Sequence, residues 1–290
     1  MRSALRPAWL SIDFEDIAHD FKREHGIDLD GPVRADALHA AYGAIETFLR
    51  AELGGVRATF FTTGVVARKC PDVVARIAAD GHEIGCHYDF HDPCRLDAPA
   101  AFDAALARGI DALEAASGQR VLGFRAPRFS LRAGDVAHFR ALDRRFAYDS
   151  SLNAASAAEA AAMAAGLGLD RLALFPVARE KAAPLLPAVK TGGSYLKLFP
   201  GAVTLRALDM AAAAGLAPMV YLHPYEFVAD RSFHVAMAEM GGMALRRRLY
   251  WSLRQAQWHV VGNRSVKPKL RRIAAAWRLA GPMRGLLPAG

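Results

Sequence analysis

Short apolar runs alternate along the chain with longer segments in which apolar residues recur every three or four positions. Runs of about four to eight apolar or β-branched residues are typical of buried strands, whereas the longer period is typical of amphipathic helices. The strand candidates are residues 9–13, 57–62, 83–86, 121–124, 146–148, 172–177 and 218–222, and the helix candidates are residues 33–53, 71–79, 98–117, 134–145, 154–165 and 204–214.

The helix predicted at residues 33–53 illustrates the pattern, because Ala37, Leu38, Ala41 and Ile45 fall on one face. Strand and helix alternate about six or seven times, with no internal sequence repeat and no Ser- or Pro-rich linker. This order predicts a single α/β domain, built as either a parallel barrel or a doubly wound sheet.

Polar residues suited to chemistry follow several of the predicted strands. Because the carboxyl ends of parallel strands meet at one edge of a barrel, we expect these side chains to converge. One carboxylate and two histidines form a metal-ligand set that leaves positions open for water and substrate. The residues concerned are Asp13, Glu15 and Asp16 in the run DFED, then His87 and His91, and then Arg125, Asp149 and His223.

Each of these residues also has an ordinary structural interpretation. The acids of DFED could open a helix, since carboxylates are favoured at helix N-termini. His87 and His91, four residues apart, could be a surface pair on one turn of a helix. Arg125 could form a strand-end salt bridge and His223 could be a hydrogen-bonded core residue. Five polar clusters at five strand ends nevertheless favour a site over five coincidences.

The composition favours one sizeable core in a reducing compartment. An apolar content of 53% in 290 residues is ample for a large domain. The first apolar run is interrupted by Asp13 and is too short for a signal peptide or a membrane span. Cys70, Cys86 and Cys94 show no CxxC spacing and no disulfide framework, so we expect reduced thiols and a cytoplasmic protein.

The net charge of +8 is concentrated in residues 240–290, which contain 11 Lys and Arg residues and no Asp or Glu. We therefore divide the chain into a domain at residues 1–239 and a basic, aromatic-containing extension at residues 240–290. Such a segment suits contact with anionic lipid headgroups or with a phosphate-bearing ligand. Nucleic-acid binding and a helix that merely covers the domain are the alternatives. We expect peripheral contact with the inner membrane and no nucleic acid.

Between about residues 9 and 228 the chain carries, in this order, SIDFED, TFFTTG, GHEIGCHYDFH, GFRAPRFS, YDSS and YLHPYEF. In type and order these motifs resemble the polysaccharide deacetylase family, the NodB-homology domains of carbohydrate esterase family 4. FRAPRFS, YDSSL, GGSYLKLFP and YLHPYEF are most similar to the branch associated with bacterial exopolysaccharide and O-antigen gene clusters. The resemblance implies a distorted (β/α)7-type barrel that holds a divalent metal ion, usually zinc.

The resemblance also implies a metal-ligand set. His87 and His91 match the metal histidines of the family, and Asp13 matches its catalytic base. The family has the base and the acidic ligand side by side, whereas DFED separates Asp13 from Asp16 by two residues. We choose Asp16 as the acidic ligand, with Glu15 as the rival.

Three further residues match the acid–base machinery of the family. Arg125 matches the arginine that pairs with the base carboxylate and orients it. His223 matches the histidine that acts as the general acid, and Asp149 matches, more loosely, an aspartate that orients this histidine.

Two positions depart from the family pattern and bear on substrate binding. Arg128 stands where many members have an aromatic residue whose backbone N–H helps bind the oxyanion, and Phe129 follows it. Tyr88 stands where the family usually has Ser or Thr. We assign Tyr88, Arg128, Phe129 and Tyr225 to substrate binding, and the extra cation indicates a different or more acidic substrate.

The function implied by the resemblance is metal-dependent hydrolysis of N-acetyl or related acyl groups from amino sugars. The setting would be the biosynthesis of bacterial surface polysaccharide, O-antigen or lipopolysaccharide, and the sugar could be nucleotide-linked, lipid-linked or polymeric. A metal-free amidohydrolase acting on a small amide is one alternative. A non-catalytic glycan-assembly module with the same fold is another.

Overall fold

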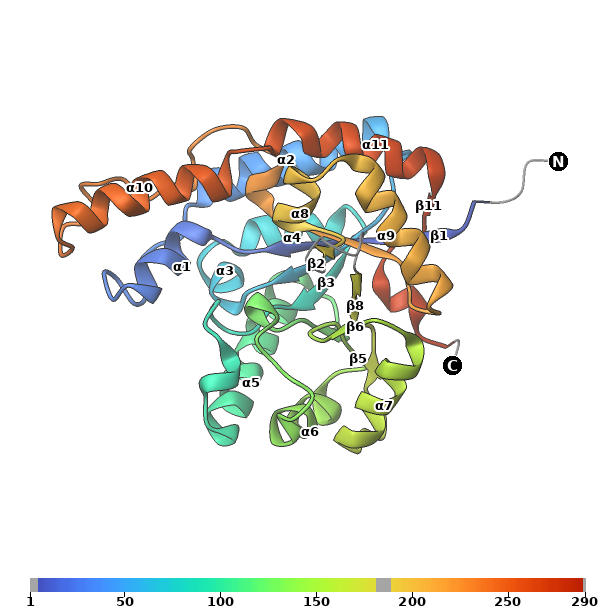
Figure 1. Cartoon of the computed structure of the whole chain (residues 1–290). Coiled ribbons are helices and arrows are strands. Elements are labelled where there is room, and N and C mark those ends of the chain that lie inside the picture. Colours follow the sequence, from blue (N-terminus) through green and yellow to red (C-terminus); the bar gives the residue numbers. More distant parts are fainter. Residues whose placement is uncertain (1–4, 181–188, 289–290) are drawn as a thin grey trace.

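A curled, mostly continuous parallel sheet forms the centre of the computed structural model, which describes residues 5–180 and 189–288 (Figure 1). Each strand pairs in parallel with its neighbours, so all carboxyl ends lie at one edge. In spatial order the strands are β10 (Met219–Leu222), β1 (Pro7–Phe14), β2 (Thr59–Thr62), β3 (Glu83–Cys86), β4 (Gly123–Phe124), β5 (Tyr148–Asp149) and β7 (Ala173–Leu174), and β11 (Arg278–Leu279) pairs with the start of β1.

A second, three-stranded sheet lies between the two edges of the curled sheet. It consists of β6 (Asn153–Ala154), β8 (Val177–Glu180) and β9 (Val189–Lys190), of which β8 and β9 are antiparallel. Gly192 then forms an isolated parallel bridge with Tyr221 of β10. The arrangement is a half-barrel, as expected for a distorted (β/α) barrel.

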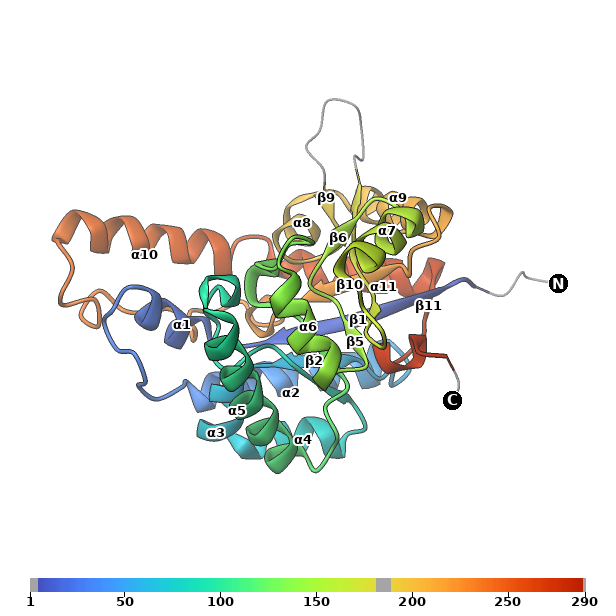
Figure 2. The same cartoon turned by 90° about the horizontal axis from the view of Figure 1, so that it is seen from below.

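Helices cover the outer surface of the sheet. Figure 2 shows α3, α4 and α5 gathered on one side and α7, α8 and α9 on the other. The helices are α1 (Ile17–Glu24), α2 (Ala35–Glu52), α3 (Gly64–Lys69), α4 (Pro71–Ala79), α5 (Pro99–Ser117), α6 (Val136–Arg145), α7 (Ala157–Leu167), α8 (Gly193–Leu198), α9 (Gly201–Ala213), α10 (Leu245–His259) and α11 (Val266–Ala276).

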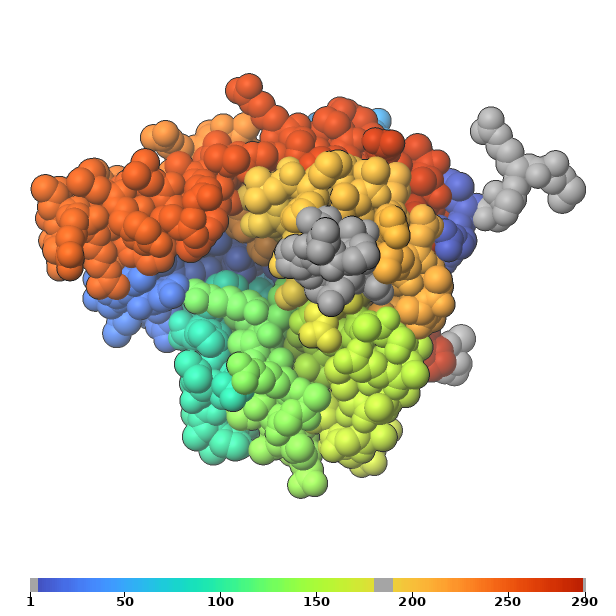
Figure 3. All heavy atoms as spheres, viewed as in Figure 1, coloured from blue at the N-terminus to red at the C-terminus, as the bar shows by residue number. Residues whose placement is uncertain are grey.

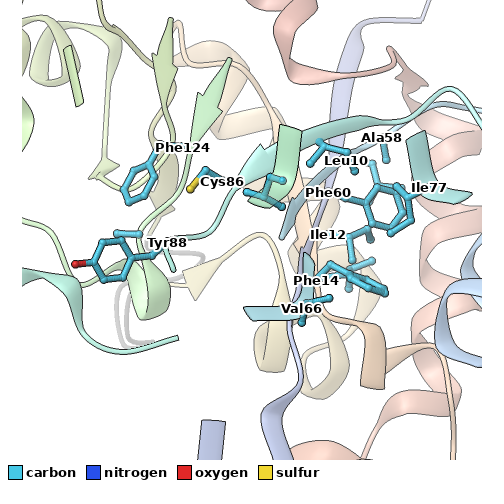
Figure 4. Close-up of a cluster of buried hydrophobic side chains, with 14 of the residues drawn as sticks. Leu10, Ile12, Phe14, Ala58, Phe60, Val66, Ile77, Cys86, Tyr88 and Phe124 are labelled. Atoms are coloured by element: carbon cyan, nitrogen blue, oxygen red, sulfur yellow. The ribbon is translucent and has the colours of Figure 1, made fainter. Parts of the chain in front are cut away.

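The side chains of β1 alternate between the two faces of the sheet, and this alternation positions the site. Leu10, Ile12 and Phe14 are buried toward the covering helices, and Figure 4 shows Ile12 and Phe14 grouped with Phe60. Each such side chain contributes about 1.5–3 kcal/mol when fully buried. The alternate positions Ser11 and Asp13 therefore point into the barrel.

Local sequence signals set several element boundaries. α4 begins at Pro71 and ends at Ala79, as predicted, because proline suits the first helical position. The predicted strand at residues 172–177 is instead split into β7 and β8 at Pro176. Proline has no N–H to donate, so the ladder is interrupted and the chain passes from the large sheet to the small one.

The C-terminal segment contributes to the barrel as well as extending from it. Leu270 and Ile273 of α11 are buried in the main core, and β11 joins the sheet beside β1. α10, in contrast, projects from the body of the molecule (Figure 1). None of the helices in the described ranges is both long and apolar enough to cross a membrane. The division at residues 239 and 240 stays a prediction.

Candidate active site

A cavity of about 410 Å³ opens at the carboxyl edge of the sheet. Most of the residues predicted from the strand ends contribute to its wall. Those in the lining are Asp13, Glu15, His87, His91, Arg128, Phe129, His223 and Tyr225. Asp20, Glu24 and several aromatic residues, which the sequence did not indicate as part of a site, also line the cavity.

Glu15, His87 and His91 form a compact cluster with the atoms expected of a metal centre. The Oε2 atom of Glu15 lies 3.2 Å from Nε2 of His87 and 2.8 Å from Nε2 of His91. This oxygen is buried and has no hydrogen-bond partner of acceptable geometry. Ligand atoms on a tetrahedral zinc ion are separated by about 3.3 Å, given Zn–N and Zn–O distances near 2.0–2.2 Å. The donor set and its spacing therefore fit a divalent ion.

The two histidines reach this cluster from a loop after β3 and not from one turn of a helix. Tyr88 between them has φ 69°, a left-handed conformation that a non-glycine residue rarely adopts. The turn that this conformation makes brings both imidazoles to Glu15. Nδ1 of His87 is 2.7 Å from the carbonyl oxygen of Arg125, a contact that orients the ring by the N–H it donates.

Asp16 does not join the cluster, so our choice of Asp16 over Glu15 as the acidic ligand does not fit the structure. One oxygen of Asp16 caps α1 by accepting from the N–H groups of Ala18 and His19, and the other accepts from the N–H of Arg34 at 2.6 Å. The signal that the sequence analysis missed is the strand period. Glu15 lies two positions after Asp13 and shares its face, whereas Asp16 turns away.

The electric field of the cluster favours a bound cation. Burial lowers the pKa of His91, but the carboxylates of Glu15 and Asp20 outweigh this effect and raise the pKa to about 9. Burial raises the pKa of Asp20 to about 6, and its carboxylate lies 3.5 Å from Nδ1 of His91. Asp20 thus faces Nδ1 of His91, the ring nitrogen that does not face Glu15, and helps to orient the imidazole. The sequence analysis does not assign a role to Asp20.

Asp13 and Arg125 form a buried ion pair next to the cluster. Nη1 of Arg125 donates to Oδ1 of Asp13 at 2.6 Å and to the hydroxyl of Ser11 at 2.8 Å. The guanidinium also lies over the ring of Phe61, 4.2 Å from its centroid. These contacts fix the orientation of the Asp13 carboxylate at the cavity wall.

His223 approaches the cavity from the end of β10. Its ring stacks on Tyr225 with an interplanar angle of 14°, and Nδ1 is 3.5 Å from a carboxylate oxygen of Glu226. Burial lowers the pKa of His223, but Glu226 outweighs this effect and the pKa is raised above its ordinary value. The imidazole therefore has a carboxylate that favours its protonated form.

Asp149 is not the residue that orients His223. Its two oxygens accept from the N–H of Ser151 at 2.9 Å and from the hydroxyl of the same residue. These bonds fix the turn after β5, and Asp149 is absent from the cavity lining. Glu226 takes the place assigned to Asp149, and its position three residues after His223 could have suggested it.

Tyr88 is also not a cavity residue, contrary to its assignment to substrate binding. Its ring is buried against Phe102, with centroids 5.4 Å apart, and its hydroxyl donates to Asp97 at 2.5 Å. The left-handed backbone turns the side chain into the core while the neighbouring His87 faces the cavity.

Arg128 and Phe129, in contrast to Tyr88, line the cavity. Both have positive φ, 58° and 52°, which presents both side chains to the cavity. Arg128 forms an ion pair of 2.6 Å with Glu24, and Phe129 packs against Tyr221. The predicted extra cation is therefore at the cavity, with a carboxylate beside it.

Residues 30–140 match the polysaccharide deacetylase family. This segment contains His87, His91 and Arg125. The match agrees with the family resemblance inferred from the sequence motifs. The exopolysaccharide branch, the metal and the substrate stay predictions. A comparison with curated proteins gave no significant match.

Similar solved structures establish the fold. A candidate polysaccharide deacetylase from Mycobacterium smegmatis is 18% identical and covers 97% of this chain and 94% of its own, with a TM-score of 0.53. A mutant of a CE4-family pseudoenzyme from Bacillus anthracis is 13% identical, with coverages of 98% and 67% and a TM-score of 0.51. A mutant of the same pseudoenzyme with restored enzymatic activity has a TM-score of 0.50 at 14% identity, with coverages of 98% and 68%. The predicted α/β barrel class is thus confirmed.

Proposed function

We propose that the protein is a metal-dependent hydrolase that removes N-acetyl or related acyl groups from an amino sugar used in bacterial surface-polysaccharide synthesis. One observation carries the proposal. The Glu15, His87 and His91 cluster, the Asp13–Arg125 pair and His223 surround a single cavity. A ligand set, a charged base and a protonatable imidazole are the parts that hydrolysis of an amide requires.

The residues divide the work of an acyl transfer to water. Glu15, His87 and His91 would hold a divalent ion, which we propose to be zinc, and this ion would supply Lewis acidity toward the acyl carbonyl. Asp13 takes a proton from the attacking water, and Arg125 holds its carboxylate in the required orientation. His223 gives a proton to the leaving nitrogen as the C–N bond breaks, so the products are a carboxylate and a free amine.

We place the reaction in the cytoplasm, on a nucleotide-linked or lipid-linked sugar. The three cysteines support a reducing compartment because all are buried and free. Arg128 supports a substrate that carries negative charge, since its guanidinium is at the cavity wall and suits phosphate.

Metal analysis combined with an activity assay tests the proposal. We expect about one divalent ion per purified chain at this site, and we expect His91→Ala to lose the ion and the activity while its circular dichroism is unchanged. His39, Cys70 and Asp72 form a second cluster that could bind a metal, so Cys70→Ser is the matched control. Full activity of the metal-free wild type would contradict the proposal.

The activity itself is best sought with a panel of UDP-linked and lipid-linked N-acetyl sugars. Mass spectrometry would register the loss of one acetyl group. Turnover has to be measured directly, because one of the structurally similar proteins is a pseudoenzyme. An absence of turnover on every panel member by metal-loaded protein would favour a non-catalytic module.

A further inference from the structure

α10 projects from the barrel and is anchored to it along one side. Figure 3 shows this helix, in orange, extending beyond the rest of the molecule at the left. Gln255 is buried and its amide exchanges two hydrogen bonds with the backbone of Val235, at 2.8 and 3.2 Å. Trp251 packs on Phe21 of α1, with centroids 5.4 Å apart. The helix therefore has a fixed orientation.

The anchored side of α10 forms part of the cavity wall. Trp251, Gln255, Trp258 and His259 all line the cavity that contains Asp13 and the metal-ligand cluster. The ring of His259 lies 5.0 Å from that of Tyr225, which stacks on His223. One face of this helix is thus continuous with the candidate active site.

The opposite side of α10 is an exposed apolar stripe. Leu245, Leu249 and Leu253 follow one another at intervals of four residues and are 61%, 50% and 74% exposed. Residues at this spacing share one face of a helix. Tyr250 is 53% exposed next to them. Large apolar side chains gathered on one exposed face indicate an interaction surface.

The arginines beside the apolar stripe indicate which kind of partner the stripe binds. Arg246, Arg247 and Arg254 lie along the same helix, and no Asp or Glu occurs from residue 240 to residue 290. An apolar face flanked by arginines is the arrangement of a helix that lies in the headgroup region of an anionic bilayer. A second copy of this helix fits less well, since two such segments would repel one another.

We propose that α10 binds an anionic membrane surface through Leu245, Leu249 and Leu253, and that it thereby presents the cavity to an amino sugar carried on a membrane lipid. The two faces of the helix carry this inference, because the apolar stripe and the cavity wall belong to one rigid element. The substrate half of the inference rests on the proposed function, whereas the membrane half does not.

Vesicle sedimentation tests the membrane half. We expect the wild type to bind vesicles that contain phosphatidylglycerol at least tenfold more strongly than vesicles of phosphatidylcholine alone. The double variant Leu249→Glu/Leu253→Glu should lose this binding. The matched control is Leu96→Glu, because Leu96 is 75% exposed but lies far along the chain from α10. Equal binding by the double variant and the wild type would overturn the proposal.

Size-exclusion chromatography separates the membrane from a second copy of the chain. A dimer that the double variant dissociates, combined with no vesicle binding by the wild type, would make the stripe a dimer interface and would overturn the proposal. A monomeric wild type that sediments with anionic vesicles supports it.

Activity measurements test the substrate half and distinguish it from the proposed function. We expect the double variant to lose at least tenfold in rate on a lipid-linked amino sugar embedded in vesicles and to keep its rate on a soluble nucleotide-linked sugar, because neither leucine lines the cavity. Asp13→Asn should lose both rates and still bind vesicles. Equal rates of the double variant and the wild type on the embedded sugar would overturn the substrate half. Vesicle binding without turnover of any sugar would support the membrane half and contradict the proposed function.

Discussion

Arg125 and Asp13 are joined by a 2.6 Å ion pair, although the side chain of Arg125 is fully shielded from solvent and that of Asp13 is only 3% exposed. The second nitrogen of the same fork, Nη2, donates to the hydroxyl of Ser150 at 3.0 Å. Removing one partner of a buried pair typically costs about 3–5 kcal/mol, because the other charge is left uncompensated. Base orientation and stability are therefore linked through Arg125.

Asp13→Asn should keep the metal and lose turnover. The amide preserves the size of the side chain but cannot accept the proton of the attacking water, so we expect kcat to fall by about 10²- to 10⁴-fold. Metal content by elemental analysis and kcat on the best panel substrate are the measurements. A loss of metal equal to that of His91→Ala would show instead that Asp13 is a ligand.

Glu15→Gln and Asp16→Asn should distinguish the roles of the two neighbouring acids, one as a metal ligand and the other as a helix cap. We expect Glu15→Gln to lose the metal, because the neutral amide is a poor ligand in the Glu15, His87 and His91 cluster. Asp16→Asn should retain it, and Asp16→Ala should lower the free energy of unfolding by about 0.5–2 kcal/mol through the lost helix cap. Thermal unfolding and metal analysis give both readouts. The opposite pattern would restore Asp16 as the ligand.

Much of the fold and of the site could be predicted from the sequence, since both follow from local patterns. The ends of the predicted strands indicate Asp13, His87, His91 and His223, which line the cavity, and Arg125, which pairs with Asp13, because parallel strands bring their carboxyl ends together. What failed were the choices that depend on backbone direction at a single residue.

Two misassigned residues have this origin, and a third, Asp149, has a different one. The strand period applied to DFED favours Glu15 over Asp16, which caps α1, and the left-handed backbone of Tyr88 turns its side chain away from the cavity. Asp149 was matched by motif alone, whereas its oxygens are taken up by the local turn at Ser151. The contribution of α10 to the cavity wall is a tertiary contact and left no local signal.

Glu226→Gln should shift the pH profile, whereas Asp149→Asn should not. Burial lowers the pKa of His223 and Glu226 raises it, with a net increase. A general acid works while protonated, so activity is lost as the pH rises through this pKa. Without the charge of Glu226 the pKa falls, and the alkaline limb of kcat/KM should move to lower pH. An equal shift in Asp149→Asn would return the orienting role to Asp149.

Arg128→Ala should weaken the binding of acidic substrates selectively. A charge-assisted hydrogen bond contributes about 1.5–3 kcal/mol, so KM for a phosphate-bearing sugar should rise roughly ten- to hundredfold while KM for a neutral sugar changes little. Glu24→Gln should act in the opposite direction, because Glu24 competes for the guanidinium at 2.6 Å. Equal changes for charged and neutral sugars would show that Arg128 has only a packing role.

Because β11 pairs with β1, the C-terminal residues that follow β11 pack against the interior of the barrel, next to the catalytic side chains. Met283 is fully buried, its N–H donates to the hydroxyl of Thr59 at 2.8 Å, and its sulfur lies 3.9 Å from the guanidinium of Arg125. In a chain truncated at residue 239, Met283 would be missing and water would reach the Asp13–Arg125 pair from that side. Deletion would therefore disturb the position of the base as well as the proposed membrane contact, and only point substitutions on α10 can examine the two separately.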